Sequence, residues 1–146
     1  MHMNNIKIFN NFAAAFELAV KDNNWLRLEE YLAEDASYVN VGGPDPKLEG
    51  RNAVIRFLKD DVGNTDKRFD TRTLIALTQP KTDGDRLSRQ WRCTYTLEGA
   101  PDLVVEGEAR YRFENNLIKE IEENVTKNSM KKSRMWMESH GEKLHA

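Results

Sequence analysis

Histidine and cysteine are nearly absent from the body of this 146-residue chain. The three histidines, His2, His140 and His145, all lie close to an end of the sequence. Chain ends tend to fray, so neither a histidine-based triad nor a histidine metal site is expected there. The single cysteine, Cys93, allows no internal disulfide and no cysteine-built metal site. Any acid–base chemistry is therefore expected from carboxylates, tyrosine or lysine, with no metal and no cofactor.

The sequence also lacks a long apolar run and an excess of one charge. No stretch of about 18 apolar residues occurs, so a membrane span is not expected. The chain carries 22 basic and 24 acidic residues, for a net charge of −2. Nucleic-acid binding needs clustered, excess positive charge, so we expect no nucleic-acid partner. The first residues show no basic-then-apolar signal, which makes a cytoplasmic location the expectation.

Hydrophobic spacing predicts helices in the first part of the chain. Phe9, Phe12 and Phe16 recur at the i, i+3, i+4 spacing of one helix face. The same reasoning gives a second helix at 25–32 and a third at about 51–61. A short strand at 37–41 and a rigid glycine- and proline-rich turn at 42–46 are expected between them.

From residue 69 onward the apolar period changes to two. Four long strands are predicted at about 69–79, 86–98, 102–114 and 117–127, separated by turn residues such as Asn115 and Asn116. Consecutive antiparallel hairpins with helices on one face give an α+β fold, a strongly curved mixed sheet under three N-terminal helices. We expect one domain over residues 1–127. The basic extension at 128–146 is expected to form a helix that packs on the domain or on a dimer partner.

The alternation of the strands places two opposite charges on the inner face. Arg89 shares a face with Trp91 and other apolar residues, and Glu123 shares a face with Ile121. Burying either charge alone is costly. Two alternatives follow: a buried ion pair of Arg89 with Glu123, or a solvated pocket that both side chains line.

Aromatic and small side chains surround this predicted pocket. In the early strand, Tyr38 and Asn40 share one face, but alternation alone does not say whether that face points inward. The candidate lining residues are Trp91, Phe12, Phe16, Tyr111 and Ala109. Each aromatic residue alone is more often ordinary core, because large apolar side chains at regular spacing usually pack.

The order of elements resembles the nuclear transport factor 2-like superfamily, and in particular its SnoaL-like members. The segments LAEDASY (32–38) and LEGRNAVIRF (48–57) are similar to recurring segments of that family. The resemblance covers about residues 6–127. It implies a half-open, cone-shaped barrel with a deep pocket, often in homodimers. Such folds serve enzymes and binding proteins alike.

Two enzyme branches of the superfamily can be compared with this chain. Where ketosteroid isomerases carry a general-base Asp and an acidic oxyanion partner, this chain has Asn40 and Ala109, which do not match that chemistry. Limonene-epoxide hydrolases are more similar: Tyr38, Asn40, Arg89 and Glu123 match their water-holding Tyr-x-Asn pair, central Arg and one Asp. The second acidic position of that branch is matched by Trp91, so its acid is missing.

These observations favour a small-molecule pocket protein that holds an apolar organic ligand. If it is an enzyme, the expected reaction is cofactor-free: a hydrolase, dehydratase or isomerase in which Glu123 acts as the base. Tyr38 and Asn40 would orient a water, and Arg89 would keep Glu123 ionised and stabilise developing negative charge. The alternatives are a non-catalytic binding module and a dimerising scaffold.

Overall fold

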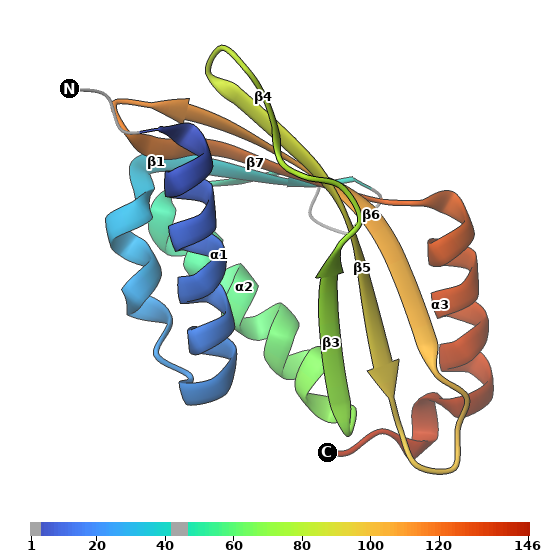
Figure 1. Cartoon of the computed structure of the whole chain (residues 1–146). Coiled ribbons are helices and arrows are strands. Elements are labelled where there is room, and N and C mark those ends of the chain that lie inside the picture. The colour runs from blue at the N-terminus through green and yellow to red at the C-terminus, as the bar shows by residue number, and fades with distance from the viewer. Residues whose placement is uncertain (1–3, 42–46) are drawn as a thin grey trace.

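The first helix begins and ends where the sequence supplies caps. In the computed structural model, which describes residues 4–41 and 47–146, helix α1 spans Asn5–Asp22 (Figure 1). The Asn4 side chain accepts a hydrogen bond from the Ile6 N–H, which has no partner inside the helix. Asn23 adopts a left-handed φ of 62° and closes the last turn. The buried face of α1 consists of Ile8, Phe9, Phe12, Ala15 and Ala19.

The second predicted helix is present, but it is a 3-10 helix and not an α-helix. Trp25–Tyr31 form a short 3-10 helix, η1, and strand β1 already begins at Leu32. Only a few residues separate the break at Asn23 from the strand, and 3-10 geometry is typical of such short connectors. In the described residues, two α-helices and two 3-10 helices, η1 and η2 (Asp66–Arg68), therefore precede strand β3. The other α-helix, α2 (Arg51–Asn64), was predicted and buries Val54, Ile55, Leu58 and Val62.

The described strands form one curved sheet in the order β2-β1-β7-β6-β5-β3, with β4 paired to β5. β1 and β7 are parallel and the remaining pairs are antiparallel, which confirms the predicted mixed, mostly antiparallel sheet. The short strands β2 and β4 were not predicted. The turn predicted at 42–46 lies outside the described residues. The strands are β1 (Leu32–Asn40), β2 (Lys47–Glu49), β3 (Thr71–Ala76), β4 (Lys81–Asp83), β5 (Arg86–Thr96), β6 (Leu103–Glu114) and β7 (Leu117–Val125).

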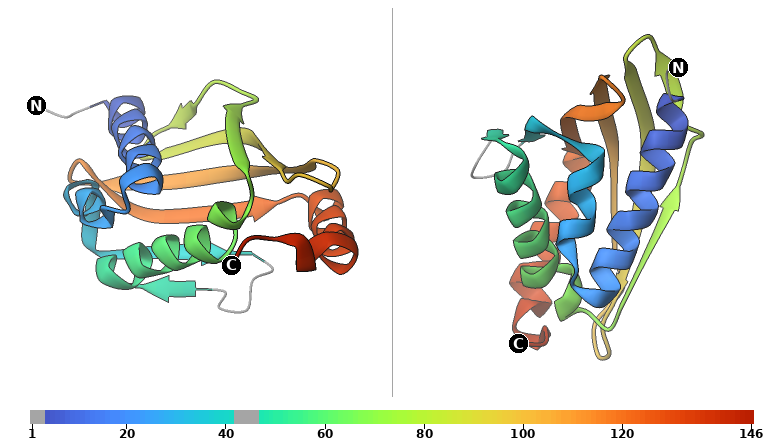
Figure 2. Two further views of the ribbon diagram at one scale, coloured as in Figure 1. Left: turned by 90° about the horizontal axis from the view of Figure 1, so that it is seen from below. Right: turned by 90° about the vertical axis from the view of Figure 1, so that its left-hand side faces the viewer.

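The concave face of the sheet carries the main core. Over this face, η1 lies between helices α1 and α2 (Figure 2, right). The tight turn between β6 and β7 uses Asn115 and Asn116, both with positive φ, as a two-residue hairpin turn requires. Because side chains alternate along paired strands, the apolar side chains of β5, β6 and β7 share the face that packs against the helices, as the period-two pattern predicts.

Helix α3 (Lys127–His140) takes over where strand β7 stops. Val125 is the last residue of β7 and lies opposite Gly107, so the start of β6 has no strand on that side. The Thr126 N–H donates to the Glu106 carbonyl at 2.9 Å, and the Ser129 hydroxyl accepts the Glu106 N–H at 2.9 Å. Helix α3 thus satisfies backbone groups that an exposed sheet edge would leave open.

A second, smaller core cluster anchors α3 and the end of the chain. Trp136 packs against Phe69 with ring centroids 5.1 Å apart, and its indole N–H donates to the Pro101 carbonyl at 2.8 Å. His145 exchanges hydrogen bonds with Arg68, at 3.0 and 2.8 Å, and its ring contacts Asp70. The expectation that this end frays is therefore wrong.

We predict that Trp136→Ala destabilises the protein by about 3–5 kcal/mol, because it empties a buried site and removes the indole hydrogen bond. Met135 is the matched control, since it is the next residue of α3 and its surface is 55% exposed. Met135→Ala should change the free energy of unfolding by less than about 0.5 kcal/mol. Urea denaturation compares the two variants, and equal losses would contradict the role given to Trp136.

Candidate functional site

One row of residues crosses the concave face of four strands. Asn40 of β1 is the Cα partner of Glu123 in β7, Glu123 is the partner of Ala109 in β6, and Ala109 is the partner of Arg89 in β5. Side chains in such a row point to the same face of a sheet. The structure therefore brings together Asn40, Arg89 and Glu123, which lie far apart in the sequence.

Glu123 and Arg89 form no ion pair, so the paired alternative is wrong. They are separated by the strand that carries Ala109, which places their Cα atoms about 9–10 Å apart. The Arg89 guanidinium lies over the Phe9 ring of α1, with its Cζ atom 4.9 Å from the ring centroid. This cation–π contact holds the cation away from the carboxylate.

The hydrogen-bond partner of Glu123 is Trp91. The indole Nε1–H donates to the Glu123 Oε2 at 3.0 Å. Trp91 belongs to β5 and Glu123 to β7, so the indole must cross the intervening strand β6. It does so over Gly107: a Cβ built there would lie 2.6 Å from the Trp91 ring and 2.6 Å from the Asn124 carbonyl oxygen. Gly107 therefore makes the Trp91–Glu123 contact possible.

Burial sets the protonation of Glu123. It raises the pKa of this carboxyl to about 7, although the Trp91 hydrogen bond and the Arg89 charge both lower the pKa. Arg89 thus opposes the shift without overcoming it, and the expectation that Arg89 keeps Glu123 ionised needs correction. A carboxyl that titrates near neutrality can both accept and return a proton.

Tyr38 lies two residues before Asn40 on β1, where it is the Cα partner of Ile121. Its ring packs on Phe57 of α2 with centroids 5.1 Å apart, and the side chain is buried. The face question left open by the sequence is answered, because Tyr38 points to the helices. Burial, and then the nearby Glu123 charge, raise the pKa of the Tyr38 hydroxyl, so this group stays protonated and can donate a hydrogen bond.

The remaining predicted lining residues belong mainly to the core. Phe12 is buried and contacts Tyr111 edge-on, at a centroid distance of 6.2 Å. Tyr111 and Ala109 are buried as well, and burial raises the pKa of the Tyr111 hydroxyl. Phe16 packs on Trp25 at the side of α1. Of the predicted lining set, Trp91 alone contacts the Glu123 carboxylate by a hydrogen bond in the described part of the chain.

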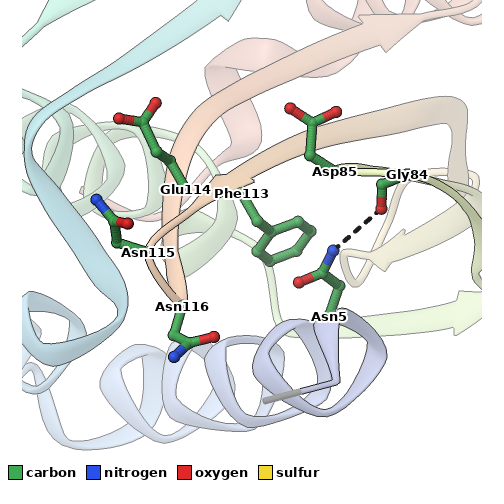
Figure 3. Close-up of a pocket in the computed structure, with 7 residues that line it drawn as sticks. All are labelled: Asn5, Gly84, Asp85, Phe113, Glu114, Asn115 and Asn116. Atoms are coloured by element: carbon green, nitrogen blue, oxygen red, sulfur yellow. Dashed lines mark hydrogen bonds between the residues drawn. The ribbon is translucent and has the colours of Figure 1, made fainter. Parts of the chain in front are cut away.

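Two surface cavities lie elsewhere. One, of about 560 Å³, lies on the opposite, charged face of the sheet. Its lining includes the charged residues Arg86, Arg110, Arg112, Glu108, Glu120 and Glu122. The other, of about 340 Å³, lies beside Asn5, where the Asn5 amide donates to the Gly84 carbonyl at 3.4 Å. Figure 3 shows the carboxylates of Asp85 and Glu114 pointing away from Asn5. Neither cavity is lined by Asn40, Arg89 or Glu123.

Sequence reasoning missed a second polar cluster on the inner side. Arg72 of β3 donates to Asp66 at 2.7 Å and to Glu17 of α1 at 2.7 and 3.2 Å. Burial raises the pKa of Asp66, and burial together with Asp66 raises the pKa of Asp61 to about 6. The signal was the alternation of Arg72 with threonines on β3, but the inner face of an edge strand is hard to identify without its partner.

Within residues 4–41 and 47–146, no three His, Cys, Asp or Glu side chains are placed to hold a metal ion. No helix there has both the length and the apolar character to span a membrane.

Comparison with known proteins agrees with the fold. The model of the SnoaL-like domain family matches residues 12–121. The chain belongs to the SnoaL-like domain family. No match was found among curated proteins.

Solved structures show the same fold as this SnoaL-like domain. Bal32a, from a soil-derived mobile gene cassette, has a TM-score of 0.67 at 19% identity, covering 91% of this chain and 99% of the other. An NTF2-like protein from Anabaena variabilis has a TM-score of 0.67 at 13% identity, covering 86% and 94%. A protein with a ketosteroid isomerase-like fold from Catenulispora acidiphila, solved in complex with trimethylamine, has a TM-score of 0.58 at 19% identity, covering 81% and 87%.

We predict that Trp91→Phe raises the pKa of Glu123 above about 7, because the lost N–H stabilised the ionised carboxylate. Gly107→Ala should act in the same direction, since the added methyl group displaces the indole. A ¹³C NMR titration of the Glu123 carboxyl measures the pKa. Trp136→Phe is the matched control, because that indole donates to Pro101 instead. An unchanged pKa in both Trp91→Phe and Gly107→Ala would contradict the contact.

Glu123 should also make stability depend on pH. Its pKa is about 7 in the folded protein against an ordinary value of 4.5. Between these values the unfolded chain has lost the proton and the folded chain keeps it, so rising pH favours unfolding. We predict that Glu123→Gln removes this penalty and gains about 1–3 kcal/mol over wild type at about pH 8, with no gain at about pH 4. Urea denaturation at both pH values tests this, and a gain independent of pH would contradict it.

Proposed function

We propose that this SnoaL-like domain binds a small, largely apolar organic molecule on its concave face and transfers a proton on it through Glu123. The observation that carries the proposal is a carboxyl with a pKa of about 7, held by the Trp91 N–H in an apolar surrounding. Carboxyls whose pKa is raised by burial cluster at functional sites, where a general base needs a pKa near the working pH.

The geometry favours isomerisation over hydration. Epoxide hydration on this fold needs one carboxylate to activate water and a second acid to protonate the opening oxygen. The second position carries Trp91, which donates a hydrogen bond but has no proton to give up. A single carboxyl is sufficient for isomerisation, because it takes a proton from one atom and returns it to another.

In the proposed reaction, Glu123 removes a proton from a carbon next to a carbonyl group. The C–H bond breaks, its electron pair forms a carbon–carbon double bond, and the carbonyl pair moves onto oxygen. Arg89 faces the substrate from the same row and would stabilise that negative oxygen, while Tyr38 and Asn40 offer hydrogen-bonding groups beside it. Glu123 then returns the proton to a different atom, which regenerates the carboxylate.

The second candidate is a binding module without catalysis. Arg89 favours it, because the guanidinium makes no hydrogen bond to any residue in the described ranges and is free to hold an anionic ligand. The structurally similar protein with bound trimethylamine supports small-molecule binding by this fold. Homodimer formation and a cytoplasmic location remain predictions for this chain.

We predict that Glu123→Gln lowers turnover of a carbonyl substrate by roughly 10²- to 10⁴-fold, the usual contribution of a general base. The wild-type rate should rise with pH through an apparent pKa near 7. Stopped assays with a panel of enolisable ketones and oxo acids measure both quantities, and Glu122→Gln on the opposite face is the control. Turnover that survives in Glu123→Gln would exclude the catalytic role, and ligand binding without turnover would favour the binding module.

A further inference from the structure

The two arginines on the concave face are treated very differently by their surroundings. Arg72 is held by three hydrogen bonds, one to Asp66 and two to Glu17. Arg89 makes no hydrogen bond and no ion pair within the described ranges, and its buried Nε has no partner. A buried guanidinium N–H without an acceptor costs free energy that folding normally avoids.

The surroundings of Arg89 hold it in place without neutralising it. The Phe9 ring lies 4.9 Å from its Cζ atom, which supports the cation through the face of the ring. Its Cα partner on β6 is Ala109, whose side chain offers no hydrogen-bond acceptor. The buried Nε of Arg51 also has no hydrogen-bond partner among the described residues, but Arg51 begins α2 and is not part of the Glu123 row.

Glu123, the nearest acid in the row, does not serve as the missing partner. One of its oxygens already accepts the Trp91 N–H, and no ion pair joins it to Arg89. Burial raises the pKa of the Glu123 carboxyl to about 7. The uncompensated positive charge therefore lies beside a group that is half protonated near pH 7.

We propose that Arg89 is the subsite for the carboxylate of an oxo acid, a molecule in which a carbonyl lies next to a carboxylate on an apolar body. The planar guanidinium matches a carboxylate in two parallel hydrogen bonds, and this pairing supplies the acceptors that Arg89 lacks. The assignment of the substrate class rests on the proposed function, whereas the anion subsite does not.

The substrate class also fits the proton transfer. With the carboxylate on Arg89, the carbon beyond the carbonyl extends along the row toward Glu123. Glu123 takes a proton from that carbon, the C–H pair forms the enol double bond, and the carbonyl oxygen takes up the negative charge next to the guanidinium. Returning the proton to that oxygen completes a keto-to-enol tautomerisation, with atoms and electrons balanced and no further reactant.

Binding of phenylpyruvate and of its methyl ester tests the subsite directly, because the ester keeps the body and loses the charge. Phenylpyruvate should shift the Arg89 ¹⁵Nε resonance and raise the melting temperature, and the ester should do neither. Arg89→Gln should weaken phenylpyruvate binding roughly 10- to 100-fold. The affinity of Arg89→Lys should lie between those of wild type and Arg89→Gln, because lysine keeps the positive charge but cannot donate two parallel hydrogen bonds to the carboxylate.

Arg110→Gln is the matched control for loss of one positive charge. Arg110 lies on the opposite face of β6, where it pairs with Glu108 and is 60% exposed, so its removal should leave binding unchanged. Glu123→Gln should bind phenylpyruvate at least as tightly as wild type, because it removes a like charge. Far-UV circular dichroism of the free variants verifies folding.

The outcomes separate the two claims. An equal affinity of Arg89→Gln and wild type, or no change at the Arg89 resonance with millimolar phenylpyruvate, would overturn the subsite. The ultraviolet absorbance of the enol measures tautomerisation. Binding that depends on Arg89 but is not accompanied by tautomerisation supports the subsite and contradicts the proposed function. Tautomerisation that is unaffected by Arg89→Gln would overturn both the subsite and the oxyanion-stabilising role of Arg89, and would leave only the role of Glu123 as the base.

Discussion

The absence of a side chain at Gly107 is the constraint on which the site depends. The indole of Trp91 crosses β6 at this residue, where a Cβ would collide with both the ring and the Asn124 carbonyl. Only this crossing lets β5 supply a hydrogen bond to Glu123 on β7. The position of one glycine thereby determines how an otherwise unpaired buried carboxyl is held, and with it the protonation chemistry of the concave face.

The sheet separates two charges that would otherwise neutralise each other. Glu123 and Arg89 lie in one row but on strands that are not neighbours. Each contacts an aromatic side chain: the Glu123 carboxylate accepts a hydrogen bond from Trp91, and the Arg89 guanidinium lies over the Phe9 ring. Each group keeps unused bonding capacity on the same face. A ligand with both an acidic proton and an anionic group would satisfy the two together, which a closed ion pair would prevent.

The sequence predicted which face of its strand each side chain occupies, but it did not predict which side chains contact one another across strands. Period-two alternation placed Arg89, Trp91 and Glu123 on the inner side, because side-chain direction in a strand is a local property. Alternation gives no register between strands, so it did not show that Ala109 separates Arg89 from Glu123 or that Gly107 lies under Trp91. The family resemblance located Tyr38 and Asn40, yet the hydrogen bond that replaces the missing acid depends on a long-range approach that local patterns do not encode.

The pKa of the Glu123 carboxyl in the wild-type protein is the most direct test of this account. Selective ¹³C labelling of glutamate, with Glu123→Gln to assign the resonance, gives the value by NMR titration. We expect a midpoint of about 7, which moves upward when the indole N–H is removed. A midpoint near the ordinary value of 4.5 would show a solvated surface carboxylate and would contradict a proton-transferring role.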